Sequence, residues 1–228
     1  MKIAIVGMKH SGSTMLFYMV RHAISMSGKN NEIDVVKSHE YVNHEKVIAT
    51  IRDPRDTSIS GFMRFSYHQS INGTCKDPMN QLRLFGVLPF LNYMRENILL
   101  AYDALSHPQQ PFLFVYEEFH RDPVSVIKNL FLDYLDLPLT LEQIETILDQ
   151  RKTFFYQADM PRDLQEYLRI QRQPLEKYDR LLTRDHDTSG GSCNKCITFF
   201  PIEYQRIILE DALVMDFLKR FSYVQDTT

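Results

Sequence analysis

The chain has 228 residues, of which 44% are hydrophobic and 24% charged, a composition typical of a globular protein. Its formal net charge of −3 argues against a general nucleic-acid-binding protein, so any anion site must be built from local groups. The apolar run at residues 3–6 is too short for a signal-peptide core or a membrane span. We therefore expect one cytoplasmic domain over residues 1–228, without a membrane span and without a nucleic-acid partner. The oligomeric state is left open.

Short apolar segments alternate with helical patterns through the first 150 residues. The patterns predict strands at 2–6, 33–36, 46–51 and 112–116, and helices at 14–27, 55–66, 80–106, 123–134 and 141–150. This alternation is typical of an α/β fold with a central parallel sheet and flanking crossover helices. Residues 153–187 are charged and aromatic and predict surface helices or a lid, and residues 202–221 predict a closing amphipathic helix.

The segment from Gly7 to Thr14 joins the first expected strand to the first expected helix. Its anion-compatible residues are Lys9, His10, Ser11, Gly12, Ser13 and Thr14. Backbone N–H groups and the dipole of the following helix favour a bound phosphate here. The spacing matches a Walker A loop, except that Ser13 stands where the lysine belongs, which argues against ATP or GTP hydrolysis. The alternative is a glycine turn that merely links strand to helix.

Two further polar motifs follow expected strands. In an open parallel sheet, ligands bind at the carboxyl ends of the strands, so Lys37 and His39 are expected at the same edge as the loop. A histidine suits general-base work, and a lysine stabilises developing negative charge. Arg52 closes the third strand, and together with Ser60 on the next helix it can hold one phosphate. The alternative for Arg52 and its neighbours is helix capping within a solvated charge run.

Taken together, four segments resemble the sulfotransferases that use 3′-phosphoadenosine 5′-phosphosulfate (PAPS). The loop at 9–14 is similar to the family's Pro-Lys-Ser-Gly-Thr-Thr, and Lys37-Ser38-His39 to its Lys-Thr-His. The family's Arg-x-Pro-x-Asp, with a serine eight residues after the arginine, and its Tyr-Glu-Asp followed by proline have counterparts in Arg52, Pro54, Asp56, Ser60, Tyr116, Glu117, Glu118 and Pro123. The resemblance covers about residues 1–135 and implies a three-layer sandwich like that of the P-loop nucleotide enzymes.

The resemblance also implies a role for each motif. The loop would hold the 5′-phosphosulfate, and Arg52 with Ser60 would hold the 3′-phosphate. His39 would take the proton of an acceptor hydroxyl or amine on a small molecule or glycan, and Lys37 would assist near the sulfuryl group. Tyr116 would lie near the adenine. Adenosine 3′,5′-bisphosphate (PAP) would be the product, and no metal is expected.

Three departures from the family pattern affect these assignments. The tryptophan that often follows the family's loop is replaced by Met15, which removes one aromatic side chain that would face the adenine. The family's loop lysine aligns with His10, and Lys9 lies one position earlier, so either side chain is a candidate for its role. In place of the family's C-terminal phosphate-binding loop the chain has Gly190 and Gly191, flanked by serines. The alternatives are a P-loop kinase or nucleotide hydrolase, or a non-catalytic nucleotide-binding homologue of the sulfotransferases.

Overall fold

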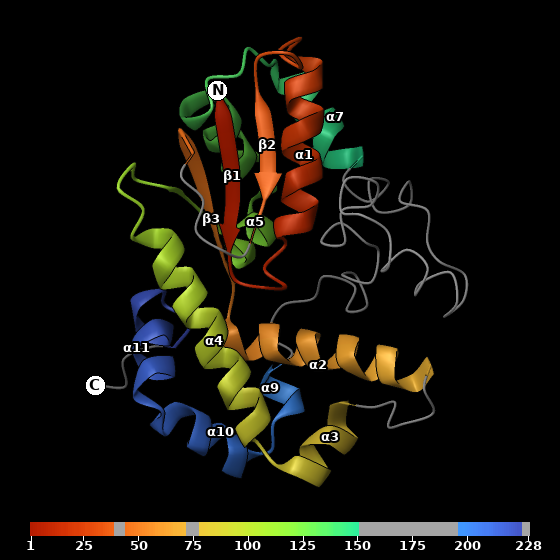
Figure 1. Cartoon of the computed structure of the whole chain (residues 1–228), viewed down its shortest axis with the longest axis vertical. Helices are drawn as coiled ribbons and strands as arrows, with labels where there is room; N and C mark the ends of the chain where they lie inside the picture. The colour runs from red at the N-terminus through yellow and green to blue at the C-terminus, as the bar shows by residue number, and fades with distance from the viewer. Residues whose placement is uncertain (39–43, 72–77, 151–195, 225–228) are drawn as a thin grey trace.

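The computed structural model describes residues 1–38, 44–71, 78–150 and 196–224 (Figure 1). Its centre is a four-stranded parallel sheet in the order β2-β1-β3-β4. The strands are β1 (Lys2–Gly7), β2 (Asp34–Lys37), β3 (Lys46–Ile51) and β4 (Phe112–Val115). Strand β1 lies between β2 and β3, so the chain passes from β1 to the neighbour on one side and then to the neighbour on the other side. The direction of the strand order therefore reverses at the carboxyl end of β1. Open α/β sheets bind their ligands at such a point.

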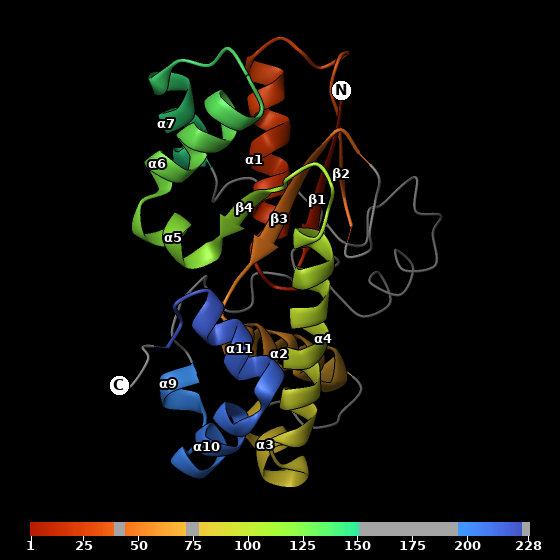
Figure 2. The same ribbon diagram turned by 90° about the vertical axis from the view of Figure 1, so that its left-hand side faces the viewer.

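Helices cover both faces of the sheet, which confirms the expected α/β fold with a central parallel sheet (Figures 1 and 2). One face carries α1 (Ser13–Met26), α5 (Tyr116–Arg121), α6 (Pro123–Lys128), a π-helical segment (Asn129–Tyr134) and α7 (Leu141–Gln150). Alternation along the strands explains this arrangement, because successive side chains point to opposite faces. Ile3 and Ile5 join the cluster with α1, whereas Ala4 and Val6 pack toward the end of α4 (Leu88–Leu105).

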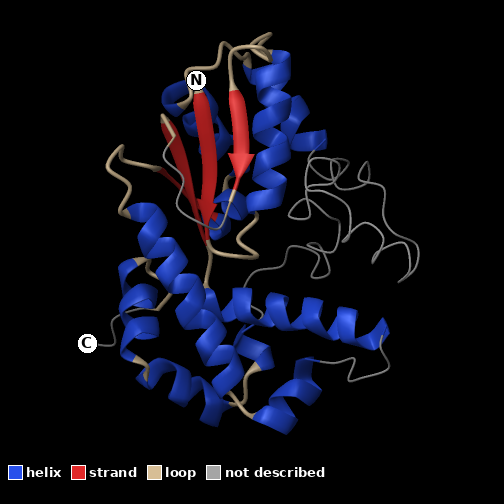
Figure 3. Ribbon diagram, in the orientation of Figure 1, coloured by secondary structure: helices blue, strands red, loops and turns tan. Residues whose placement is uncertain are grey.

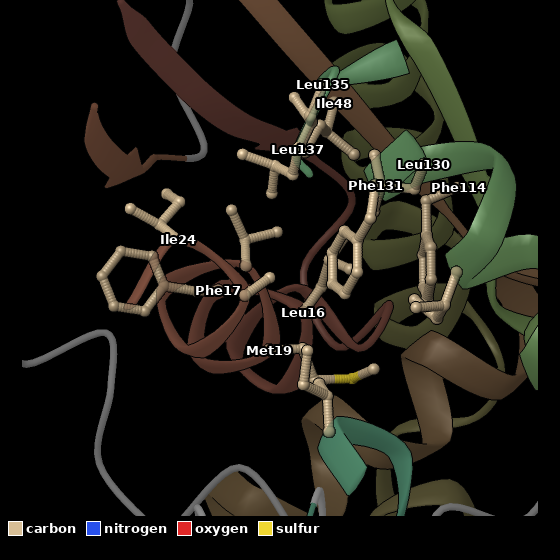
Figure 4. Packing of buried hydrophobic residues seen from close by; sticks show 14 of the residues in the cluster. Leu16, Phe17, Met19, Ile24, Ile48, Phe114, Leu130, Phe131, Leu135 and Leu137 are labelled. Carbon is tan, nitrogen blue, oxygen red and sulfur yellow. The ribbon is translucent and has the colours of Figure 1, made fainter. Parts of the chain in front are cut away.

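The larger core lies between the sheet and α1, where Leu16 and Met19 meet Ile48, Phe114 and Phe131 (Figure 4). These side chains are fully buried. Burying each of them contributes on the order of 1.5–3 kcal/mol relative to an exposed position. The rigid packing under α1 fixes the start of this helix relative to the carboxyl end of β1.

A second group of helices packs beyond the carboxyl ends of the strands (Figures 1 and 3). It consists of α2 (Pro54–Ile71), α3 (Pro78–Phe85), α9 (Cys196–Phe199), α10 (Ile202–Glu210) and α11 (Ala212–Arg220), gathered around α4. Its core includes Ile59, Phe90, Met94 and Phe217, all fully buried. The last described part of the chain therefore docks beside the edge of the sheet where ligands are expected.

Four expected elements are wrong in detail. The single helix at 80–106 is two helices, because Gly86, with φ of +67°, ends α3. The helix at 202–221 is also two, because Asp211 leaves the helical conformation and caps α11 through Val214 N–H at 3.0 Å. The fourth strand stops at Val115, and Tyr116 already belongs to α5. The helix at 123–134 changes from α- to π-helical hydrogen bonding at Asn129. The predicted surface helices or lid at 153–187 lie outside the described residues, as does the loop after them.

Candidate functional site

The loop between β1 and α1 depends on two glycines. Gly7 has φ of +117°, and a Cβ there would lie 2.4 Å from the backbone oxygen of Thr50. Gly12 has φ of +82° and directly precedes α1; a Cβ there would lie 2.7 Å from Cδ2 of Tyr116. No acidic residue stands in the first turn of α1, so nothing on the helix itself offsets the positive end of its dipole. The two glycines therefore allow the tight turn that joins β1 to the start of α1, where the sequence predicts a phosphate loop.

The Ser11 hydroxyl maintains the shape of this loop. Its Oγ lies 2.6 Å from the Met8 carbonyl oxygen and 2.7 Å from Thr50 Oγ1, and the side chain is fully buried. Thr50 Oγ1 in turn lies 3.0 Å from the Val6 carbonyl oxygen. Ser11 thus joins the loop to β3 in the interior, and these contacts occupy its hydroxyl group.

Lys37 lies at the same edge, as predicted. It pairs with Ile5 across the sheet, and its Nζ donates to Thr14 Oγ1 at 2.9 Å. Only 7% of Lys37 is exposed. Such burial is rare for a lysine unless its ammonium group has a partner. An ammonium group therefore does lie at the N-terminus of α1, although it comes from β2 instead of from the loop. His39 is two residues beyond, outside the described residues.

Lys9 is held by α4. Its backbone N–H donates to Asn97 Oδ1 at 2.7 Å, and its Nζ forms an ion pair with Glu96. The Nζ also lies 5.9 Å from the centre of the Tyr93 ring, within cation–π range. Asn97 is fully buried, and its Nδ2 donates to the Tyr93 carbonyl at 3.0 Å. Helix α4 thus fixes the first half of the loop through both the backbone and the side chain of Lys9.

Arg52 and Tyr116 meet the second half of the loop. Arg52 Nη1 donates to the His10 carbonyl at 3.1 Å, and the guanidinium carbon lies 4.4 Å from the centre of the Tyr116 ring. His10 has φ of +60°, uncommon outside glycine, and its ring centre lies 6.3 Å from that of Tyr93. Because a Cβ on Gly12 would also meet Tyr116, the loop, Arg52 and Tyr116 converge here although they come from three separate segments of the sequence.

Two buried oxygen atoms on α2 lack hydrogen-bond donors. Ser60 Oγ and Asp56 Oδ2 have no hydrogen-bond partner among the residues that the structure describes. Ser60 is 4% exposed and Asp56 is fully buried. The two residues are four apart on one helix and so lie on the same face. Because buried polar atoms are nearly always hydrogen-bonded, the Ser60 hydroxyl indicates a place where a bound group supplies a partner, whereas Asp56 Oδ2 faces Arg52 Nη2 at 3.6 Å.

The residues that follow Arg52 belong to a hydrogen-bonded group of charged side chains. Asp53 caps α2 through Arg55 N–H at 2.9 Å and binds the Arg55 guanidinium with both carboxylate oxygens. The backbone N–H of Asp53 donates to Glu117 Oε1 at 3.0 Å, and the Tyr223 hydroxyl donates to Glu117 Oε2 at 2.8 Å. Burial raises the pKa of Glu117 above its usual value. The end of the described chain is thereby joined to the motif that carries Arg52.

Sequence reasoning assigned no role to Glu96, Asn97 and Tyr223, and it quoted Asp56 and Glu117 only as members of the family motifs. A signal existed for Asn97, an amide within the apolar face formed by Phe90, Met94 and Ala101 on α4. Of the predicted site residues, His39, Gly190 and Gly191 lie outside the described residues. Within the described part of the chain, no group of three or more potential metal ligands occurs, and no helix is both long and apolar enough to cross a membrane.

Comparison with known proteins follows the same motifs. The model of the sulfotransferase domain family matches residues 41–177, a span that includes Arg52, Ser60 and Tyr116. The phosphate loop, Lys37 and His39 precede this span, and Gly190 and Gly191 follow it. No curated protein matches the sequence.

Two solved structures are similar to the chain in fold. Mouse sulfotransferase SULT7A1 complexed with PAP has a TM-score of 0.60 and 15% identity, covering 97% of this chain and 88% of that one. A retinol dehydratase in complex with androsterone and the inactive cofactor PAP has a TM-score of 0.53 and 14% identity, covering 96% of this chain and 80% of that one.

Proposed function

The chain belongs to the sulfotransferase family, and we propose that its phosphate loop, Lys37, Arg52 and Ser60 bind PAPS while His39 activates the acceptor. The activity is transfer of a sulfuryl group from PAPS. The family match over more than half of the chain is the observation that carries this conclusion. The motifs that precede the matched span add independent support, because they lie at the same edge of the sheet.

The 3′-phosphate is assigned to Arg52 and Ser60. Arg52 is 2% exposed and lies against the loop, and a buried guanidinium is well suited to binding a phosphate. Ser60 Oγ is buried without a hydrogen-bond partner among the described residues, so it can donate to a phosphate oxygen. These two groups fit a nucleotide that carries a phosphate on the 3′-oxygen of its ribose. This 3′-phosphate is present in PAPS and absent from ATP.

The 5′-phosphosulfate is assigned to the loop and to Lys37. The N–H groups at the start of α1 and the Lys37 ammonium beside Thr14 provide positive charge at one place. A preformed arrangement of this kind stabilises negative charge that develops during transfer without reorganisation. Because Lys9 is ion-paired with Glu96 and bonded to Asn97, we assign it to anchoring the loop. His10 then becomes the candidate for the family's loop lysine.

The proton of the acceptor is assigned to His39, which follows β2 two residues after Lys37. As the acceptor oxygen or nitrogen forms its bond to sulfur, its proton passes to His39, the bond from sulfur to the 5′-phosphate oxygen breaks, and PAP leaves. The acceptor is proposed to be a small molecule with a hydroxyl or amine. The Tyr93 ring beside His10 supports this choice, because it provides an aromatic face next to the loop.

The proposal is tested by turnover with PAPS and a panel of phenols, alcohols, amines and oligosaccharides, with the full chain. We expect His39→Ala to lower kcat by about 100-fold or more, as loss of a general base does, while PAP binds as tightly as before. His22→Ala, on α1, serves as the matched control and is expected to retain wild-type turnover. Unchanged turnover in His39→Ala would refute the assignment of the base.

A further inference from the structure

Asp56 is a fully buried carboxylate one helical turn after Arg52. Its Oδ2 lies 3.6 Å from Arg52 Nη2, and its Oδ1 accepts the backbone N–H of Cys196 at 2.9 Å. Burial, and after it the charge of Asp53, raises the pKa of the Asp56 carboxyl. A buried carboxylate is costly unless its partners compensate for the lost hydration, so its position calls for an explanation.

The partners of Asp56 place it between the donor site and the C-terminal helices. On one side, Asp56 meets the guanidinium of Arg52, whose other contacts include the His10 carbonyl and the face of Tyr116. On the other side, Asp56 holds the first residue of α9. The ion pair limits the directions that the guanidinium can take, and the contact with α9 limits the position of the carboxylate.

Asp56 is poorly suited to contacting the phosphate itself. An ionised carboxylate repels a phosphate, and nearby Ser60 offers a neutral hydroxyl on the same face of α2. We propose that Asp56 is a positioning residue, which orients Arg52 for the 3′-phosphate and makes that orientation depend on the docking of the segment that begins at Cys196. This inference rests on the proposed function of Arg52 and assigns a task to a residue that does not touch the donor.

The test compares the binding of PAP and of adenosine 5′-monophosphate (AMP) to the wild type, Asp56→Asn and Arg52→Ala. Asparagine keeps the size of the side chain and the oxygen that accepts Cys196 N–H, but removes the charge that faces Arg52. We expect Asp56→Asn to weaken PAP about tenfold or more, because the ion pair that limits the directions of the Arg52 guanidinium is lost, and to leave AMP within about twofold. Steady-state kinetics are expected to show a raised KM for PAPS with little change in kcat.

A second pair of variants tests the dependence on α9. Cys196→Pro removes the N–H that Asp56 accepts, whereas Cys196→Ala keeps it, and both lose the thiol. Proline is tolerated at the first position of a helix, which is where Cys196 stands. We expect only Cys196→Pro to lower the preference for PAP over AMP.

The outcomes separate this inference from the function beneath it. A wild type that does not prefer PAP over AMP refutes the 3′-phosphate role of Arg52 and removes the basis of the inference. If Arg52→Ala loses the preference but Asp56→Asn keeps it, binds PAP more tightly, or weakens PAP and AMP equally, the positioning role is wrong and the proposed function stands. Equal PAP-to-AMP ratios in the two Cys196 variants would overturn the dependence on α9.

Discussion

Replacing Gly12 by alanine probes the junction between the phosphate loop and the arginine motif. Gly12 has φ of +82°, and a Cβ added there would lie 2.7 Å and 2.9 Å from two carbons of the Tyr116 ring. Gly28 offers a matched control at the other end of α1, because it has φ of +74° and nothing within 4 Å of the corresponding Cβ position. The two substitutions impose the same backbone strain, but only Gly12→Ala adds a collision.

The expected magnitudes follow from these distances. Left-handed backbone costs an alanine about 1–2 kcal/mol, and this is the whole effect expected for Gly28→Ala. Overpacking against Tyr116 adds about 1–3 kcal/mol for Gly12→Ala. Tyr116 cannot withdraw freely, since the Arg52 guanidinium lies 4.4 Å from its ring centre. The collision should therefore also displace Arg52 and weaken PAP binding about tenfold, whereas Gly28→Ala binds PAP like the wild type.

Urea unfolding measures the two stability changes, and calorimetric titration measures the PAP affinity. A double-mutant cycle with Tyr116→Ala is expected to show that Gly12→Ala costs less once the ring is absent. Equal destabilisation by the two glycine substitutions, or wild-type PAP affinity in Gly12→Ala, would refute the reasoning that links the loop to Arg52 through Tyr116.

Two further predictions concern Glu117. Tyr223→Phe removes the hydroxyl that donates to Glu117 at 2.8 Å and should lower the free energy of unfolding by about 1–3 kcal/mol in urea. Tyr204→Phe is the control, because the Tyr204 hydroxyl bonds to no residue that the structure describes; equal losses would contradict the assigned bond. Burial raises the pKa of Glu117, so the folded state favours its protonated form. Its contribution to stability is therefore fully present below the ordinary value of about 4.5 and is lost as the pH rises through the folded pKa. The measured quantity is the free energy of unfolding of the wild type minus that of Glu117→Gln. It should fall as the pH rises from about 4.5 through the folded pKa of Glu117. A difference that stays flat or rises would show that burial does not control the pKa of this carboxyl.

Local sequence was enough to predict the parts of the site that depend on local conformation. The loop could be predicted because Gly7 and Gly12 supply positive φ between a buried strand and a helix. The position of Lys37 followed from the rule that parallel strands end at one edge, and its pairing with Ile5 confirms this. For Arg52 and Tyr116, only the resemblance to the family implied a place in the donor site, and the structure brings the two side chains together, with the guanidinium carbon 4.4 Å from the centre of the Tyr116 ring.

The remaining features depend on long-range packing, which carries little local signal. Lys9 and Glu96 are 87 positions apart, and Tyr223 and Glu117 are 106 apart. Neither pair can be recognised without knowing that α4 passes beside the loop and that the C-terminal segment docks beside α2. The two broken helices were missed for a different reason, because Gly86 and Asp211 interrupt apolar patterns that otherwise continue across them.

The central claim is that this site recognises a nucleotide with a 3′-phosphate, and one calorimetric titration tests it directly. PAP, ADP and ATP are titrated into the 228-residue chain under identical salt and pH. The account predicts that PAP binds at least about tenfold more tightly than ADP or ATP, because Arg52 and Ser60 contact only the additional phosphate. Equal affinities, or a preference for ADP or ATP, would contradict the account.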